Sequence, residues 1–360
     1  MRSTIMASGL VALELLEQRR LLSVSMHQSG STLQITGNGV GESVQILDEH
    51  AGVHVTTTVS VDRDNDGSFF SVGDRHRNFT GITNFSITLS GAGSALDVRL
   101  GDNYIGVDKS FVVRMGDGSD RFNFTTAPSQ GLRGSHVTLD VNTGSGNDQV
   151  SLSLQDIARS SSITGTINTN GGNDRVQVSG YTAIRDSSVA ITTNLGSGND
   201  SYQELIDLEG FRLYGSSSSW RTTVNGGAGN DTIAQRAANG SRSAVFEGLF
   251  SNDFIGGSGS DAITADMETL SLNGGTLHLH ADGGNGSDTV SIGATIHPAS
   301  RGGRLDIFAA GGAGDDVLGL TLNADNTTNT YARRTAILDG GEGNDLGTLL
   351  GSGRMRVINL

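Results

Sequence analysis

The chain has 360 residues, a formal net charge of −14 and no cysteine, and it contains 53 glycines but only 2 prolines. The absence of cysteine excludes a disulfide framework and thiolate chemistry. The negative charge disfavours nucleic acids and anionic membranes as partners and favours cations. Glycine in this amount, without a collagen triplet, predicts many tight turns.

Residues 1–23 are interpreted as an N-terminal targeting or processing segment. Its short apolar run is interrupted at Glu14, and no small-residue cleavage site follows, so it is a poor secretory signal. Residues 16–23, L-E-Q-R-R-L-L-S, resemble the LEPR-x-LL element of bacterial surface proteins, with Gln18 where that element has proline. The resemblance implies an extracellular or cell-surface location. An amphipathic N-terminal helix is the alternative. No stretch of the sequence approaches the roughly 18 apolar residues of a membrane span.

Residues 24–84 are expected to form an N-terminal β cap region, and an acidic cluster lies within it at 61–68, V-D-R-D-N-D-G-S. Three of its carboxylates occupy positions 1, 3 and 5 of an EF-hand-like loop, with Gly67 at position 6. These candidate metal ligands are Asp62, Asp64 and Asp66. The twelfth position is Gly73 rather than glutamate, so a partial calcium loop and a plain polar turn both remain open.

Residues 85–360 contain a glycine-rich motif that repeats about every 28 residues, as in N-G-G-A-G-N-D-T-I at 225–233. The last aspartate of each copy is Asp120, Asp148, Asp174, Asp200, Asp231, Asp261, Asp288, Asp316 or Asp345. The gaps between them are 28, 26, 26, 31, 30, 27, 28 and 29 residues. A degenerate copy at 91–95 has Ala95 in place of the carboxylate. Ten units of this fixed period predict a solenoid.

Short runs of alternating aliphatic residues flank each glycine turn, such as V-T-L-D-V at 137–141 and Q-V-S-L-S-L at 149–154. Alternation with period two is typical of half-buried strands, and glycine supplies the positive-φ corner between them. The sequence therefore predicts an all-β fold. We expect a parallel β-helix of about ten coils, with one glycine-rich turn per coil.

The turns resemble the hemolysin-type RTX repeat G-G-x-G-x-D-x-U-x, in which U is a large aliphatic residue and which binds calcium. Five copies keep the complete G-G-x-G-x-D hexad, and their first glycines are Gly226, Gly256, Gly283, Gly311 and Gly340. The four preceding copies carry Met115, Thr143, Thr169 and Leu195 at that position. The resemblance implies Ca²⁺ between stacked turns, held by the aspartates and by backbone carbonyls. The family runs nonapeptides in tandem, whereas this chain has one motif per coil, so a wider β-helix with a single column of turns is expected.

Stacking the coils would bring the repeated aspartates into one column. Two unit charges about 5 Å apart repel by roughly 1 kcal/mol in water and about 3 kcal/mol at an effective dielectric near 20. Cations or raised aspartate pKa values would relieve this repulsion. Carboxylate and carbonyl oxygens suit Ca²⁺, whereas zinc would need His or Cys. The alternative is a metal-free ladder, because Asn and Asp side chains also stabilise turns unaided. The asparagines available for it are Asn147, Asn173, Asn199 and Asn230.

These patterns together predict an extracellular, calcium-binding structural or adhesive surface protein. Calcium ions are the predicted partners, with cell-surface glycans or other surface proteins as candidates. Longer connections at 201–224 and 232–252 carry aromatic residues that are candidates for a glycan-binding face, or for local packing. They are Tyr202, Phe211, Tyr214, Trp220 and Phe246.

Catalytic motifs are missing from the sequence: it has no G-x-S-x-G elbow, H-E-x-x-H pair or P-loop. His278 and His280 share one strand face, where a solvent-facing pair is expected. The chain is therefore predicted not to be an enzyme. A calcium-dependent polysaccharide lyase is the enzymatic alternative, and it would require Arg212 or Arg221 beside a carboxylate cluster.

Overall fold

The computed structural model describes most of the chain. The described residues are 24–39, 41–51, 54–63, 66–71, 73–129, 131–181, 183–207, 211–237, 244–297, 300–324, 333–351 and 354–360. The interpreted targeting segment 1–23 lies outside them. Every regular element within them is a β-strand, and the strands form two sheets.

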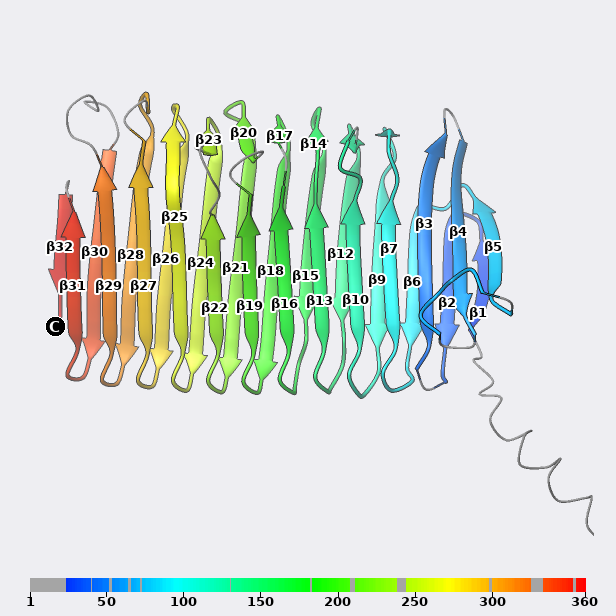
Figure 1. The fold of residues 1–360 in the computed structure, drawn as a ribbon, viewed down its shortest axis with the longest axis horizontal. Helices are drawn as coiled ribbons and strands as arrows, with labels where there is room; N and C mark the ends of the chain where they lie inside the picture. The colour runs from blue at the N-terminus through cyan, green and yellow to red at the C-terminus, as the bar shows by residue number, and fades with distance from the viewer. Residues whose placement is uncertain are drawn as a thin grey trace, which may run out of the picture.

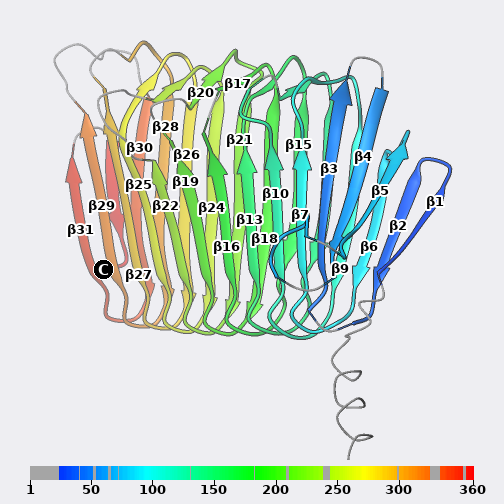
Figure 2. The same ribbon diagram turned by 45° about the vertical axis from the view of Figure 1, so that its right-hand side comes forward.

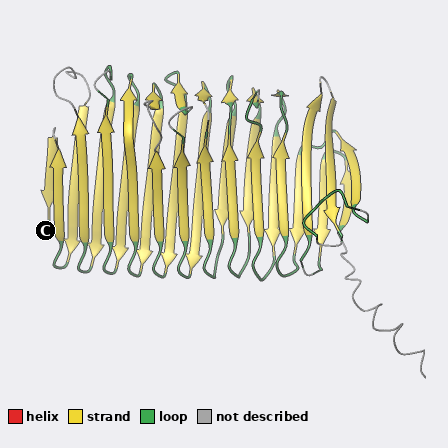
Figure 3. Cartoon of the chain, viewed as in Figure 1, coloured by secondary structure: helices red, strands yellow, loops and turns green. Residues whose placement is uncertain are grey.

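The two sheets run side by side along the long axis of a flattened solenoid of about nine turns (Figure 1). In each coil the chain descends one sheet, turns at the lower edge in Figure 1, and ascends the other sheet. The glycine-rich turns therefore line one edge of the rod, and the longer connections line the opposite edge (Figure 3). The predicted parallel β-solenoid is confirmed, with about nine turns against the ten units read from the sequence.

The first sheet has 13 strands. In spatial order they are β1 (Ser25–Ser29), β2 (Thr32–Gly37), β6 (Asn84–Leu89), β9 (Lys109–Met115), β12 (His136–Asn142), β15 (Ser162–Asn168), β18 (Ser188–Ser197), β21 (Ser219–Ala228), β24 (Leu249–Ser258), β26 (Thr276–Asn285), β28 (Arg304–Ala313), β30 (Arg333–Glu342) and β32 (Arg354–Ile358).

The second sheet has 19 strands. Its long row is β5 (Arg75–Thr80), β4 (His54–Asp62), β3 (Ser43–Ala51), β7 (Ala95–Leu100), β10 (Arg121–Thr126), β13 (Gln149–Leu154), β16 (Arg175–Gly180), β19 (Ser201–Ile206), β22 (Thr232–Ala237), β25 (Ala262–Leu272), β27 (Thr289–Ile296), β29 (Val317–Ala324) and β31 (Leu346–Gly351). Six short strands follow the upper edge, namely β8 (Tyr104–Ile105), β11 (Leu132–Arg133), β14 (Ile157–Ala158), β17 (Ala183–Arg185), β20 (Arg212–Tyr214) and β23 (Ala244–Phe246).

The coils stack in register, so that equivalent side chains form columns through the core. Val137 pairs with Ile163, which pairs with Val189, and Val189 pairs with Trp220. All four side chains are fully buried. Burying one such side chain contributes about 1.5–3 kcal/mol, so the repeated columns are the main source of stability.

The N-terminal end of the rod is closed by antiparallel strands (Figure 2). β1 pairs with β2, and β3, β4 and β5 form an antiparallel meander that joins the second sheet through β7. An unpaired strand edge can pair with a strand of another chain. The antiparallel strands at this end block the addition of further parallel coils.

One alignment made from the sequence is wrong by one residue. Ala95 was expected at the aspartate position of the degenerate copy, but Ala95 pairs with Arg121. The residue equivalent to Asp120 is therefore Ser94. The physical reason is that the strand register, rather than the spacing of glycines, fixes which residues stack.

Of the two alternatives for the aromatic residues of the longer connections, the structure supports local packing for four of the five. Tyr202, Phe211, Trp220 and Phe246 are fully buried, and only Tyr214 is partly exposed. The Phe211 ring contacts the Trp220 and Phe246 rings edge to face, with centroids 5.4 and 6.2 Å apart. The four buried aromatic residues fill the core of the middle coils, so they offer no stacking platform to a sugar.

Candidate metal site

Each of the five complete glycine-rich turns has glycine at three positions, for two different reasons. In the turn at 226–231, Gly227 and Gly229 have φ of 101° and 128°, which L side chains rarely adopt. Gly226 has no such conformation, but a β-carbon there would lie 2.5 Å from Oδ2 of Asp231. The second and third glycines therefore serve backbone geometry, and the first glycine avoids a clash with the carboxylate oxygen.

The aspartates predicted as metal ligands form one continuous column. The backbone N–H of each aspartate donates to Oδ1 of the aspartate one coil further on, as Asp261 does to Asp288 at 2.7 Å. The column begins at Ser94 N–H, which donates to Asp120, and ends at Asp316 N–H, which donates to Asp345. These bonds are 2.6–2.9 Å long. The structure thus brings together all nine predicted aspartates.

A second ladder runs along the outside of the same turns, with the opposite polarity. Asn173 N–H donates back to Asn147 Oδ1 at 2.7 Å, and Asn199 N–H donates to Asn173 at 2.8 Å. Asn230 N–H continues the series by donating to Asn199 at 2.8 Å. The asparagine ladder considered from the sequence is therefore present, and it needs no metal.

The second oxygen of most column aspartates has no partner. Oδ2 is buried and makes no hydrogen bond in eight of the nine. They are Asp120, Asp148, Asp174, Asp200, Asp231, Asp261, Asp288 and Asp316. None of the ion pairs in the described part of the chain includes a column aspartate. An unpaired buried carboxylate oxygen is costly, and its presence in every coil calls for an explanation.

Burial raises the pKa of these carboxyls. It raises the pKa of Asp120 to about 7 and the pKa of Asp174 and Asp288 to about 6. Backbone N–H donation opposes the rise, while neighbouring aspartates in the column add to it. A cation or bound protons would relieve the cost of holding these carboxylates as buried anions.

In the five C-terminal turns the first residue has no side chain, and oxygens of the aspartate and of the next coil lie close to its Cα; this position is called the gap. A β-carbon at Gly283 would lie 2.5 Å from Asp288 Oδ2 and 2.5 Å from the Gly311 carbonyl oxygen. These two acceptors therefore face the same small space. The gap recurs at Gly226, Gly256, Gly311 and Gly340, where the next coil again supplies a backbone carbonyl.

The four N-terminal turns fill the same position with a side chain. Thr169 Oγ1 donates to the carbonyl oxygen of Leu195 in the next coil at 2.7 Å. Thr143 is fully buried and Met115 is nearly so. The sequence difference between the two groups of turns is thus a difference between a filled and an open position.

The residues at the five gaps fit a hard cation by chemical type, because carboxylate and carbonyl oxygens are the ligands Ca²⁺ takes. Each gap brings one carboxylate and one carbonyl, against the six to eight oxygens of a full shell. Within the described residues, no group of three or more His, Cys, Asp or Glu side chains is placed to hold a metal. Backbone carbonyls and oxygens of adjacent coils would therefore have to complete any site.

The acidic cluster at 61–68 is only partly described. Asp62 is buried and its Oδ2 accepts the backbone N–H of Gly67 at 3.0 Å. Asp66 is exposed and Oδ1 accepts the N–H of Ser68 at 2.7 Å. Asp64 lies outside the described residues. The observed bonds are those of a polar turn.

The residues considered for catalysis are not assembled into a site. Arg212 lies on β20 in the second sheet, and Arg221 lies on β21 in the first. His280 Nδ1 contacts Asp253 Oδ1 at 2.5 Å on the outer face, and His278 is half-buried on the same strand. No described ion pair includes either arginine.

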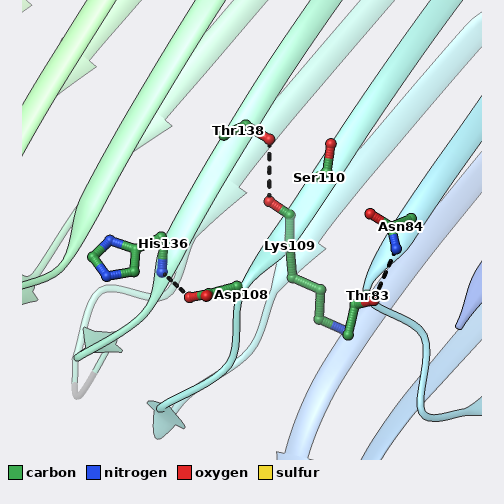
Figure 4. Close-up of a pocket in the computed structure, with 7 residues that line it drawn as sticks. All are labelled: Thr83, Asn84, Asp108, Lys109, Ser110, His136 and Thr138. Atoms are coloured by element: carbon green, nitrogen blue, oxygen red, sulfur yellow. Dashed lines mark hydrogen bonds between the residues drawn. The ribbon is translucent and has the colours of Figure 1, made fainter.

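A shallow hollow of about 420 Å³ lies on the first sheet across β6, β9 and β12 (Figure 4). Two of its polar residues are already paired: Asp108 Oδ1 accepts the N–H of His136 at 2.9 Å, and the His136 ring contacts Ser162 Oγ at 2.8 Å. The hollow has no aromatic platform, so it supports no ligand by itself.

Comparison with known proteins adds no identity: no family model, no curated protein and no solved structure matches the chain. None of the described segments is a helix with the length and apolar character needed to cross a bilayer.

Proposed function

We propose that this protein is a calcium-stabilised β-solenoid with a structural or adhesive role outside the cell. The observation that carries the proposal is the column of buried aspartates with unpaired Oδ2 atoms. At the complete turns the cation would be held by Oδ2 of the aspartate and by first-glycine carbonyls. A bound Ca²⁺ would neutralise the carboxylates.

The open and filled positions divide the column into two parts. We propose that ions bind at the five gaps beginning with Gly226 and ending with Gly340. The four N-terminal turns, from Asp120 to Asp200, are expected to bind none, because threonine, leucine or methionine occupies the equivalent place. This restricts the nine sites implied by the repeat to five.

Thermal unfolding of the full chain, followed by circular dichroism, tests the proposal. We expect the midpoint to rise with Ca²⁺, relative to EDTA and to Mg²⁺. Each site contributes about 2.7 kcal/mol when free Ca²⁺ is 100 times its dissociation constant. Equal thermal unfolding midpoints in EDTA and in millimolar Ca²⁺ would contradict the proposal.

Two matched variants locate the ions. Asp288→Asn and Asp148→Asn each keep an Oδ oxygen that can accept the backbone N–H of the preceding coil. We expect Asp288→Asn to reduce the calcium-dependent rise and the number of bound ions measured by equilibrium dialysis. Asp148→Asn should leave both unchanged. Equal losses in the two variants would contradict the division into open and filled turns.

A metal-free structural solenoid is the second candidate. Its specific support is that each Oδ2 at an open turn faces a carbonyl oxygen, to which a protonated carboxyl could donate. The raised pKa values of Asp174 and Asp288 favour such protonation. A rod that is fully folded in EDTA at pH 5 and unaffected by Ca²⁺ at pH 8 would favour this candidate.

The extracellular location rests on the resemblance of residues 16–23 to a surface-protein element and on the elongated shape (Figure 1). Millimolar external Ca²⁺ would then promote folding after export. Antibody labelling of intact cells tests the location: signal on intact cells is expected, and signal only after lysis would contradict it.

A further inference from the structure

A buried acid–base pair joins the N-terminal meander to the stacked coils. Asp48 lies on β3, and Lys109 is the first residue of β9. Lys109 Nζ is 2.9 Å from Asp48 Oδ2, and both side chains are fully buried. In the next coil the place of Lys109 is taken by Val137, so the lysine occupies a column that is otherwise apolar there.

The groups around the pair hold both reactive atoms in fixed positions. The Thr57 hydroxyl donates to Asp48 Oδ1, and the Tyr104 hydroxyl donates to Asp48 Oδ2. The lysine Nζ itself donates to the carbonyl oxygen of Ile82. Hydroxyl donors therefore reach both carboxyl oxygens, and the amine reaches only the oxygen that also contacts the tyrosine.

The surroundings exclude water from the pair. The centroids of the Phe85 and Tyr104 rings lie 5.5 and 5.8 Å from Lys109 Nζ, and both rings are buried. Burial lowers the pKa of Lys109, against the opposing effect of the Asp48 charge. A buried ion pair bears a large desolvation penalty, which a neutral amine and a neutral carboxyl group avoid.

We propose that Asp48 and Lys109 condense to form an intramolecular amide bond between Cγ and Nζ. The proposal concerns a modification site in the cap region and is independent of calcium. Lys109 is also one of the residues that line the described hollow, but its side chain is fully buried (Figure 4).

The reaction balances without any added reagent. A proton moves from the Lys109 ammonium to Asp48 Oδ2, which leaves an amine and a carboxylic acid. The Nζ lone pair attacks Cγ, the C=O electron pair moves to Oδ1, and the Thr57 hydroxyl stabilises the oxyanion. A second proton from Nζ reaches Oδ2, where the Tyr104 hydroxyl assists departure. The Cγ–Oδ2 bond breaks and one water molecule leaves.

The bond would tie two distant parts of the chain, because 109 − 48 = 61 residues separate the partners. Closing a loop of this length restricts the unfolded chain. It would hold the β3–β4 hairpin on the end of the rod even when the hydrogen bonds of the cap open.

Intact-mass measurement of the purified full chain under denaturing conditions tests the proposal. The expected mass is lower than the sequence mass by one water molecule. Proteolysis should then yield a branched peptide containing both Asp48 and Lys109, identified by fragmentation. A mixture in which the bonded fraction grows while the folded protein is incubated also supports the proposal. A wild-type chain of full mass, with an unmodified Lys109 peptide, overturns it.

Variants separate this bond from water loss elsewhere in the chain. Lys109→Arg keeps a positive charge and should have the full mass. Loss of water from this variant too would place the dehydration at another site and overturn the proposal. Thr57→Val removes the donor to Oδ1 and should slow bond formation by about 100-fold. Tyr104→Phe should also slow it by about 100-fold through loss of proton assistance. Rates equal to wild type in both folded variants would contradict the roles of these hydroxyls.

Discussion

The N-terminal and C-terminal halves of the solenoid share a backbone but differ at one position in each turn. Both halves stack in register and carry the aspartate column. The N-terminal turns place Thr143 or Thr169 where the C-terminal turns place Gly283 or Gly311. The comparison shows that the column itself does not require a cation-sized space. What the complete turns add is a first glycine, whose missing side chain lets the carboxylate and a carbonyl oxygen approach its Cα.

Raising the pH without metal is expected to have the largest effect. The pKa of Asp120 is raised from 3.8 to about 7, and those of Asp174 and Asp288 from 3.8 to about 6. The folded state therefore binds more protons than the unfolded state between these values, so stability is full below about pH 4 and is lost as the pH rises through 6 to 7. One pKa unit is worth about 1.4 kcal/mol, and the summed loss should exceed roughly 5 kcal/mol.

Amide hydrogen exchange measures this pH effect separately in each half of the solenoid. In EDTA, protection should fall in both halves between pH 5 and pH 8. Adding Ca²⁺ at pH 8 should restore protection in residues 225–345 more than in residues 116–200. Restoration of equal size in the two halves would refute the contrast.

A substitution at the third glycine should be damaging in both halves alike. A β-carbon at Gly286 would run into the carbonyl of Gly259, and one at Gly146 into the carbonyl of Gly118, at φ of 140° and 132°. Gly286→Ala and Gly146→Ala should each cost about 3 kcal/mol or more in urea unfolding. Gly274→Ala, which has φ of 84° but open space, is the control and should cost about 1–2 kcal/mol. Unequal losses of unfolding free energy in Gly286→Ala and Gly146→Ala would mean that the two halves differ in the backbone of the turn itself.

The first-glycine position should respond differently in the two halves. Gly283→Ala places a β-carbon 2.5 Å from two oxygens and should cost about 1–3 kcal/mol and reduce the calcium-dependent rise in melting temperature. Thr169→Ala removes the bond to the Leu195 carbonyl and should cost about 1 kcal/mol at any calcium concentration. A calcium response that survives intact in Gly283→Ala would argue against ions in the gap.

The smallest expected effect is on the outer ladder. Asn199 Oδ1 accepts the N–H of Asn230 on the exposed edge, where water can replace it. Asn199→Ala should therefore lower the free energy of unfolding by about 0.5–1 kcal/mol, equally with and without Ca²⁺. A loss that depends on calcium would assign the asparagines to the metal site.

The sequence predicted the architecture because its signals are repeated. Alternation along strands and a fixed spacing of Asp148, Asp174 and Asp200 define coils whose register is then imposed by the core. An error arose where the repeat is degenerate, at Ser94, and two alternatives stayed open where a side chain can point either way, at Phe211 and Trp220. Burial of an aromatic residue depends on the width of neighbouring coils, which no local pattern records.

Only part of the candidate site could be predicted from the sequence. The aspartates follow from their spacing, but the distinct role of Gly283 follows from the position of the Gly311 carbonyl in the next coil. The sequence signal for this role was the replacement of the first glycine by Thr143 and Thr169 in the N-terminal turns. The pairing of Asp48 with Lys109 had no signal beyond the rarity of lysine, because the partners are far apart in the chain.

The aspartate column has a direction, since each coil donates its N–H to the carboxylate of the following coil. Every interior coil thus gives one bond forward and accepts one from behind, whatever its neighbours' sequences. A gene segment encoding one unit could be duplicated or lost without leaving an unmatched donor inside the stack. The length of the rod is therefore free to change in evolution by whole units, and only the two ends are unique.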